Sequence, residues 1–188
     1  MEEIKKTLKN IFHLSEKEFT IFLSAFTKMV LHKNDVFIEA GKICNKIGLI
    51  EKGLMTCVYN KDGNEIIDEF AFENYFITNY YSFLTHTASE KEIRCIEDTT
   101  LYVISREQLE QLATTNPFIE RMNSIMNEKL FLRAHNRIKS LLLHSASERY
   151  QQLITERPDL AQRIPQYLLA AYLNVSPETI SRIRKNSV

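Results

Sequence analysis

The pattern of apolar and polar positions changes twice along the chain. Apolar residues first recur at helical spacing, as at Ile4, Leu8 and Phe12, and continue in a second helical segment up to Phe26. From Met29 onward the apolar runs are short and are separated by turn residues, which is typical of antiparallel strands. After Pro117 the helical spacing returns and persists to the end. The pattern therefore predicts helices, then a set of strands, then helices again.

Local signals mark the ends of several predicted elements. Ser15 followed by Glu18 indicates a capping box at the start of the second helix, and Ser105 caps the helix EQLEQLA. The segment Lys61-Asp62-Gly63-Asn64 is typical of a hairpin turn. The predicted strands are VFIEA, IGLIEKG, LMTCVYN, EIIDEFAF, IRCIE and LYVIS. Strands this short, joined by such turns, predict an antiparallel β roll or barrel.

The helix after Pro117 carries two apolar stripes. One consists of Ile119, Met122, Met126, Leu130, Ala134, Ile138 and Leu141, and the other of Phe118, Ile125 and Leu132. Two stripes suit a helix that its own domain covers on one side and a partner on another. We therefore predict a homodimer with Ile119, Met122, Met126 and Leu130 on the dimer helix. Burial of both stripes within one subunit is the alternative.

Residues 166–185, QYLLAAYLNVSPETISRIRK, predict a helix-turn-helix. Its inward positions are Ala170, Leu173, Val175, Ile180 and Ile183. Ala170 is small enough for two helices to cross closely, and Asn174 tolerates the positive φ that the corner requires. Ser176 can cap the second helix, whose first position suits Pro177. An ordinary helical hairpin inside a larger domain is the alternative interpretation.

Aromatic residues are concentrated between the two groups of predicted strands. Seven of them fall within fourteen residues: Phe70, Phe72, Tyr75, Phe76, Tyr80, Tyr81 and Phe83. One interpretation is that strand positions and a short helix fill the roll with rings. The other is that some of these rings line a pocket for an apolar or aromatic effector, because ligand pockets are mostly apolar with a few polar groups.

Charge is distributed unevenly although the formal net charge is zero. Residues 1–132 contain 15 Lys and Arg against 20 Asp and Glu, whereas residues 133–188 contain 9 against 4. An acidic body joined to a basic end predicts that the C-terminal part faces nucleic acid.

The remaining chemistry-bearing residues argue against several classes of protein. Cys44, Cys57 and Cys95 are odd in number and contain no C-x-x-C pair, so we expect packed thiols and neither disulfides nor a cysteine metal site. The five histidines are scattered, which predicts no metal or haem site. We find no nucleophile and base signature, signal peptide or bilayer-spanning run. We therefore expect a cytoplasmic protein that is not an enzyme.

The order of these elements resembles that of the cAMP receptor protein/FNR (Crp/Fnr) family of bacterial transcription regulators. The segments that carry the resemblance are KNDVFIEAGK, IGLIEKGLM and QYLLAAYLNVSPETISRIRK, and the C-terminal part is similar to the shorter branch common in Bacteroidetes. The resemblance implies an α+β fold. Its parts are a double-stranded β-helix (β roll) sensor domain of the cyclic-nucleotide-binding type at residues 1–116, a dimerisation helix at 117–143, and an all-α helix-turn-helix domain at 144–188.

By resemblance, the second helix of the helix-turn-helix enters the major groove of double-stranded DNA with a two-fold operator, and RNA polymerase is a further partner. The positions implied in DNA binding are Ser176, Pro177, Glu178, Thr179, Ser181, Arg182 and Lys185. Arg182 is the candidate for a bidentate contact to guanine and Glu178 for accepting from cytosine. Pro177 stands where the family often has another base-reading Arg, so we expect a different operator base there.

The effector site departs from the family pattern. Cyclic-nucleotide-binding members carry a Phe-Gly-Glu cassette and an Arg-Ser pair, whereas this chain has Phe72-Glu73-Asn74, with Ser89 and Glu90 in place of Arg-Ser. A cyclic phosphate would lose its cation and meet a carboxylate, so we predict no cAMP binding. The cysteine cluster of iron-sulfur sensors is also absent. The candidate pocket residues are Phe72, Glu73, Tyr75, Tyr80, Tyr81, Ser89 and Glu90, and the effector is unidentified.

Two functions follow from these observations. The main hypothesis is a homodimeric, sequence-specific DNA-binding transcription regulator. The alternative is a small-molecule-binding or protein-interaction module whose helix-turn-helix does not read DNA.

Overall fold

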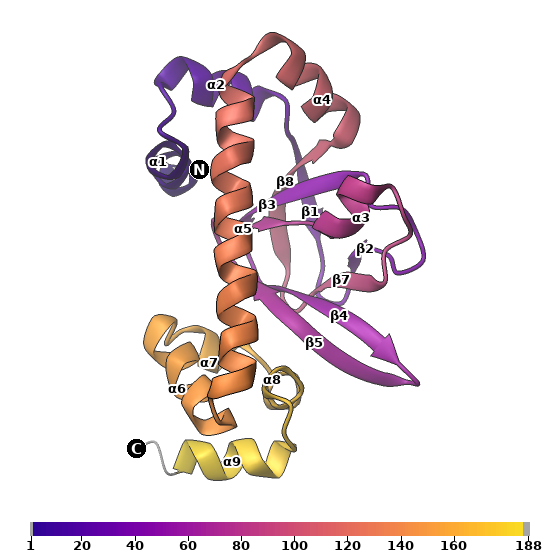
Figure 1. The fold of residues 1–188 in the computed structure, drawn as a ribbon, viewed down its shortest axis with the longest axis vertical. Coiled ribbons are helices and arrows are strands. Elements are labelled where there is room, and N and C mark those ends of the chain that lie inside the picture. The colour runs from indigo at the N-terminus through magenta and orange to yellow at the C-terminus, as the bar shows by residue number, and fades with distance from the viewer. Residues whose placement is uncertain (1, 186–188) are drawn as a thin grey trace. The chain divides into compact units, whose positions relative to one another are not determined.

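A computed structural model describes residues 2–185. The chain divides into two compact units. The first unit contains the residues up to Tyr59 together with Glu69–Asn127, and the second contains Asn60–Asp68 together with the residues from Glu128 onward. The long helix α5 (Phe118–Leu143) contributes to both units (Figure 1).

Two helices precede the strands in the first unit. They are α1 (Glu2–Phe12) and α2 (Glu16–Ser24), and the predicted capping box of Ser15 and Glu18 is present at the start of α2. Both helices pack beside the N-terminal part of α5 (Figure 1). The shared core includes Ile4, Leu8, Phe12, Phe19, Phe22, Phe118, Ile119 and Met122. This helical core positions the start of α5.

The strands form two four-stranded sheets. The first sheet has the order β1-β8-β3-β6 and the second has the order β2-β7-β4-β5. Their bounds are β1 (Thr27–Leu31), β2 (Val36–Ile38), β3 (Lys46–Lys52), β4 (Met55–Lys61), β5 (Asn64–Ala71), β6 (Phe76–Ile77), β7 (Lys91–Cys95) and β8 (Thr99–Ser105). The predicted hairpin joins β4 to β5, with positive φ angles of 54° at Asp62 and 83° at Gly63. A β roll that helices precede and follow in the sequence confirms the predicted α+β fold class.

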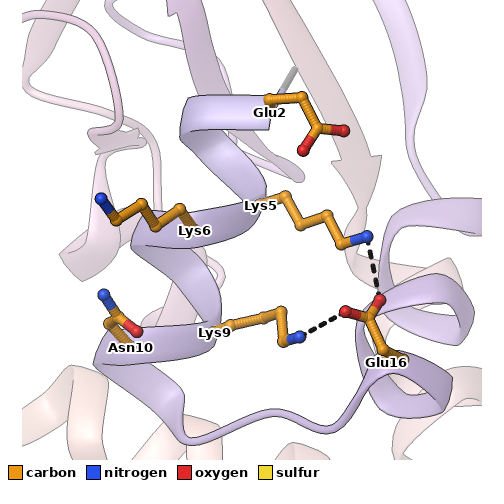
Figure 2. Close-up of a pocket in the computed structure, with 6 residues that line it drawn as sticks. All are labelled: Glu2, Lys5, Lys6, Lys9, Asn10 and Glu16. Carbon is orange, nitrogen blue, oxygen red and sulfur yellow. Dashed lines mark hydrogen bonds and ion pairs between the residues drawn. The ribbon is translucent and has the colours of Figure 1, made fainter.

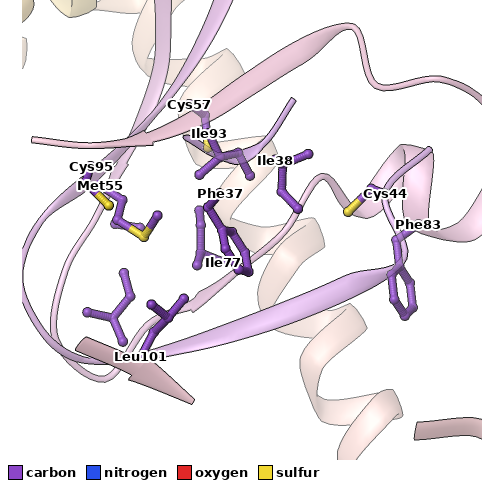
Figure 3. Packing of buried hydrophobic residues seen from close by; sticks show 12 residues of the cluster. Phe37, Ile38, Cys44, Met55, Cys57, Ile77, Phe83, Ile93, Cys95 and Leu101 are labelled. Atoms are coloured by element: carbon purple, nitrogen blue, oxygen red, sulfur yellow. The ribbon is translucent and has the colours of Figure 1, made fainter. Parts of the chain in front are cut away.

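Apolar side chains fill the space between the two sheets. The cluster consists of Phe37, Ile38, Cys44, Ile50, Met55, Cys57, Ala71, Ile77, Phe83, Ile93, Cys95 and Leu101. Phe37 lies near the middle of this group, whereas Cys44 and Phe83 lie at one end (Figure 3). The three cysteines are buried free thiols, and burial raises the pKa of Cys95. They therefore act as small packing groups, as the sequence predicts.

Of the remaining helices, one lies among the strands in sequence and the others follow them. α3 (Tyr80–Thr85) lies between β6 and β7, and α4 (Arg106–Thr115) begins at the predicted cap, Ser105. After α5 come α6 (Ala146–Glu156), α7 (Leu160–Arg163), α8 (Gln166–Leu173) and α9 (Pro177–Lys185). The buried apolar residues described in these last four helices are Tyr150, Leu160, Leu168, Leu169, Ala170, Leu173, Ile180 and Ile183, and Ile164 is buried directly after α7.

Candidate nucleic-acid interface and effector site

The corner between α8 and α9 has the conformation that the sequence predicts. Asn174 ends α8 in the left-handed region, with φ 56° and ψ 49°. Its amide and that of Val175 donate to the carbonyl oxygen of Ala170. Ala170 is 1 % exposed, so a larger side chain would separate the helices that pack there. These features confirm a helix-turn-helix at residues 166–185.

The first turn of α9 is capped by Ser176. Its Oγ accepts from the amide of Thr179 at 3.3 Å, and Pro177 occupies the first helical position, where no donor is needed. A hydrogen bond from Ser176 is the main cause that lowers the pKa of the Glu178 carboxyl. Glu178 therefore stays ionised at neutral pH and remains a hydrogen-bond acceptor. The start of α9 is also fixed by Gln166, whose Nε2 donates to the Pro177 carbonyl at 2.9 Å.

The residues that the sequence marks for DNA binding lie in α9 or directly before it. Ile180 and Ile183 are buried on the opposite side of the helix. The residues Ser176, Pro177, Glu178, Ser181, Arg182 and Lys185 are exposed, and Thr179 is half-buried. Six of the seven predicted positions are therefore accessible to solvent, and their role in DNA binding stays a prediction.

Much of the basic charge in the C-terminal part is engaged inside the second unit. The guanidinium groups of Arg157 and Arg163 bind the carboxylate of Asp159 at 2.8 and 3.3 Å. Arg184 donates from Nε to the hydroxyl of Tyr150 at 3.2 Å. Charge counting alone therefore overstates the cationic surface available to a phosphate backbone.

The apolar face of α5 differs from the one that the sequence indicates. Ile119 and Met122 are only 1 % and 5 % exposed, because they pack into the helical core of their own unit. Met126 is half-buried against the same core, and Leu130 is half-buried. The large apolar residues that are exposed on α5 are Phe131, Leu132, Ile138, Leu141, Leu142 and Leu143. The alternative of burial within one subunit thus applies to Ile119 and Met122.

Three of the predicted effector residues form the turn between β5 and β6. The rings of Phe72 and Tyr75 lie 4.3 Å apart, and Tyr75 also packs on the core of the roll. Glu73 accepts from the amide of Gly53 at 2.9 Å. These contacts hold one end of the roll together.

Ser89 and Glu90 lie at a second place, beside the start of α3. Ser89 is 2 % exposed, and its hydroxyl accepts from Asn79 at 2.7 Å and donates to the Lys91 carbonyl at 2.5 Å. Asn79 also caps α3 through the amide of Ser82. Glu90 is exposed. Sequence reasoning missed Asn79, although an Asn directly before a short helical segment is a recognisable N-cap signal.

Tyr80 and Tyr81 complete the predicted set on α3. The Tyr80 hydroxyl donates to Oδ1 of Asn127 on α5 at 2.5 Å, and partial burial raises the pKa of Tyr80. Tyr81 is 69 % exposed. The structure therefore places the seven candidate residues in the β5–β6 turn, beside the start of α3 and on its surface.

A shallow groove lies elsewhere, between α1 and α2 (Figure 2). It is lined by Glu2, Lys5, Lys6, Lys9, Asn10 and Glu16. Lys9 and Lys5 both bind the Glu16 carboxylate, at 2.5 and 2.9 Å, and their hydrogen bonds lower its pKa. Two of the three lysines thus serve to join the helices.

The described part of residues 2–185 contains neither a cluster of metal ligands nor a helix suited to crossing a membrane. No group of three or more His, Cys, Asp or Glu side chains in this range is arranged to hold a metal ion. None of the helices described there combines the length and the apolar character that crossing a membrane requires.

The geometry defines a β roll of the cyclic-nucleotide-binding type in the first unit and a helix-turn-helix in the second. Residues 28–116 match the protein family described as Cyclic nucleotide-binding domain. This match covers most of the roll and ends just before α5.

Solved structures share the fold over most of the chain. FixK2 from Bradyrhizobium japonicum has a TM-score of 0.75 at 17 % identity, over 86 % of this chain and 83 % of that one. The c-di-GMP-responsive global regulator CLP from Xanthomonas campestris has a TM-score of 0.71 at 17 % identity, over 89 % of each chain. The catabolite activator protein of Thermus thermophilus has a TM-score of 0.59 at 20 % identity, over 94 % of this chain and 85 % of that one. A comparison with curated protein sequences found no match.

Proposed function

We propose that this protein is a homodimeric, sequence-specific DNA-binding transcription regulator of the Crp/Fnr type. The observation that carries the proposal is the exposed polar face of α9, which Asn174 and Ser176 hold at a defined corner. A helix presented in this way fits the major groove. Further support comes from solved structures of the same fold, two of which are a global regulator and a catabolite activator protein.

Arg182 and Glu178 are the proposed base-reading residues. Both side chains are exposed, and residues four apart lie on the same face of a helix. The guanidinium of Arg182 can bind guanine through two parallel hydrogen bonds, and the ionised Glu178 can accept from the amino group of cytosine. Ser176 and Thr179, in the first turn, are better placed for phosphate oxygens because helix N-termini favour anions. The operator of a two-fold dimer would have half-sites about one helical turn apart.

Replacing Arg182 with alanine should remove discrimination at one base pair of each half-site. A bidentate contact contributes about 1–3 kcal/mol of discrimination, so affinity for the preferred base should fall about 5- to 150-fold towards that for the other bases. An operator is first selected from random duplexes. Fluorescence anisotropy on that operator and its single-base variants then gives the specificity at each position.

Lys185→Ala is the matched control because it removes a positive charge from the same helix. If Lys185 contacts phosphate, this variant should bind every sequence more weakly and reduce the salt slope by about one. An Arg182→Ala protein that still distinguishes all four bases at every position would contradict the assignment. If the unchanged protein selects no sequence at moderate salt, the DNA-reading proposal itself fails, and a binding module that does not read DNA is favoured.

The proposed subunit contact is the exposed apolar line of α5. Phe131, Ile138 and Leu142 follow spacings of seven and four residues, which place them along one side of the helix. His135 belongs to the same line, and its ring stacks on Phe131 at a centroid distance of 6.2 Å. An apolar line of this kind is suited to a second copy of the same helix about a two-fold axis. Leu130 and Met126, predicted from the sequence, would lie towards the edge of such a contact.

We further propose that the sensor domain does not bind cAMP. Ser89 occupies the position of the family's phosphate-binding Arg, and its hydroxyl is already engaged by Asn79 and the Lys91 carbonyl. The neighbouring Glu90 adds a negative charge that repels a phosphate. A desolvated phosphate without a cationic partner loses its strongest hydrogen bonds.

Titration calorimetry with cAMP at millimolar concentration should therefore show no binding heat above that of dilution. The protein used must be folded. Its ability to select a DNA sequence in the preceding experiment establishes this. Saturable binding with a dissociation constant below about 1 mM, equivalent to about 4 kcal/mol, would show that the interpretation of Ser89 and Glu90 is incorrect. In that case small molecules that copurify with the protein should be identified by mass spectrometry.

A further inference from the structure

The carbonyl groups at the end of α8 show how the helix-turn-helix is held. The last four carbonyl groups of a helix have no partner within it and need other donors. The amides of Asn174 and Val175 donate to the Ala170 carbonyl, and the Asn174 amide also reaches that of Ala171. The carbonyls of Tyr172 and Leu173 remain to be accounted for.

Two arginines from other helices supply these donors. Arg137 of α5 donates from a terminal guanidinium nitrogen to the Tyr172 carbonyl at 3.0 Å, and its guanidinium lies 4.0 Å from the centre of the Tyr172 ring. Arg149 of α6 donates to the Leu173 carbonyl at 2.6 Å. Its other terminal nitrogen donates to the carbonyl of His144, just after the end of α5, also at 2.6 Å.

Both arginines are placed for these internal contacts. They are half-buried, unlike Arg182, which is exposed on α9. The Nε of Arg149 is buried and has no hydrogen-bond partner, which is unfavourable by itself. That cost is offset by charge-assisted bonds to two carbonyls and by the favourable position of a cation at helix C-termini. A flexible phosphate-binding side chain would not need to be enclosed in this way.

We propose that Arg137 and Arg149 are positioning residues that fix the helix-turn-helix to the C-terminal part of α5. Together they attach the end of α8 to α5 and α6, immediately before the corner at Asn174. Within this unit, rotation of α5 would therefore carry α8 and the corner with it. The orientation of α9 relative to α5 would stay the same. The consequence for DNA recognition rests on the proposed function, whereas the attachment itself does not.

Amide hydrogen exchange tests the attachment without DNA. A hydrogen bond to a charged group contributes about 1.5–3 kcal/mol, which is about tenfold or more in a local opening equilibrium. Arg137→Met and Arg149→Met should therefore each speed exchange at Asn174 and Val175 by about tenfold or more. Lys139→Met is the matched control. It removes an exposed positive charge from the same helix, and exchange at the corner should not change. Arg137→Lys, which restores a cation and a donor, should recover part of the protection.

Exchange at the amides of α6 and α7, which belong to the same unit as both arginines, shows whether that unit is folded in each variant. If the Arg149→Met protein is unfolded, the comparison of Arg137→Met with Arg137→Lys still tests the proposed attachment. Unchanged exchange at Asn174 and Val175 in a folded Arg137→Met protein would overturn the proposal.

Salt titrations on the selected operator separate positioning from phosphate contact. If Arg137 is a positioning residue, Arg137→Met should lower specific affinity and leave the slope of log affinity against log salt unchanged. A slope reduced by about one, with all sequences bound equally more weakly, would show a phosphate contact and contradict the proposal. If the unchanged protein selects no operator, the DNA-binding function fails, and the exchange experiment still tests the attachment.

Discussion

A chain in which Phe131 and Leu142 are both replaced by glutamate should be monomeric and should bind a two-fold operator about 10²- to 10⁴-fold more weakly. The two side chains are 69 % and 77 % exposed, so the substitution need not disturb the subunit's own core. In a dimer about a two-fold axis, the new carboxylates would face those of the other copy and would prevent apolar contact. A monomer would engage one half-site and lose the second, linked binding event.

Sedimentation equilibrium gives the oligomeric state, and anisotropy on full and half operators gives the affinities. Val30→Glu with Ile43→Glu is the matched control, because these apolar residues are 61 % and 55 % exposed and lie outside α5. The control protein should remain dimeric and bind normally. The proposed contact would be refuted by a dimer that survives the two α5 substitutions. A wild-type monomer that binds its operator specifically would refute the dimeric function altogether.

The helix-turn-helix could be predicted from the sequence because its signals are local. Asn174 takes the left-handed conformation, Ser176 caps the next helix, and Pro177 begins it, all within four residues. The same holds for the capping boxes and for the Asp62-Gly63 turn of the roll. In each case the conformational preference of one or two residues decides the local backbone, whatever the rest of the chain does.

The faces of α5 could not be assigned from periodicity. A helix with apolar residues on more than one side does not indicate which side meets its own domain. Ile119 and Met122 lie against α1 and α2, which are about a hundred residues away in sequence, and that contact depends on the tertiary fold. The sequence therefore indicated a two-sided helix, and the structure was needed to locate the exposed line from Phe131 to Leu142.

The partners of the effector-site residues and of the basic residues could not be predicted from the sequence either. Ser89 could be aligned with the missing Arg, but its bond to Asn79 depends on how α3 packs against the following strand. Likewise, Arg137 and Arg149 contribute to the basic character of the C-terminal part, yet they donate to carbonyls at helix ends. Composition gives the number of charges and does not give their partners.

Gly53→Ala should strongly destabilise the β roll, costing about 2–6 kcal/mol. Gly53 lies between β3 and β4 with a φ of +117°, where L side chains are strained. An added Cβ would lie 2.7 Å from Cα of Thr99 and 2.8 Å from the carbonyl oxygen of Asp98. Backbone strain contributes about 1–3 kcal/mol, and overpacking against a rigid backbone contributes about 1–3 kcal/mol more. Urea unfolding followed by circular dichroism measures the change in the free energy of unfolding.

Gly41→Ala separates the two causes of this effect. Gly41 also has a positive φ, +83°, but nothing lies within 4 Å of its added Cβ. Its substitution should therefore cost only the conformational part, about 1 kcal/mol. The difference between the two variants measures the close approach of the β3–β4 turn to the start of β8, where Thr99 lies. Equal losses would mean that the backbone around Gly53 and Thr99 moves apart without cost. The β3–β4 turn, whose Gly53 amide donates to the Glu73 carboxylate, would then not be rigid.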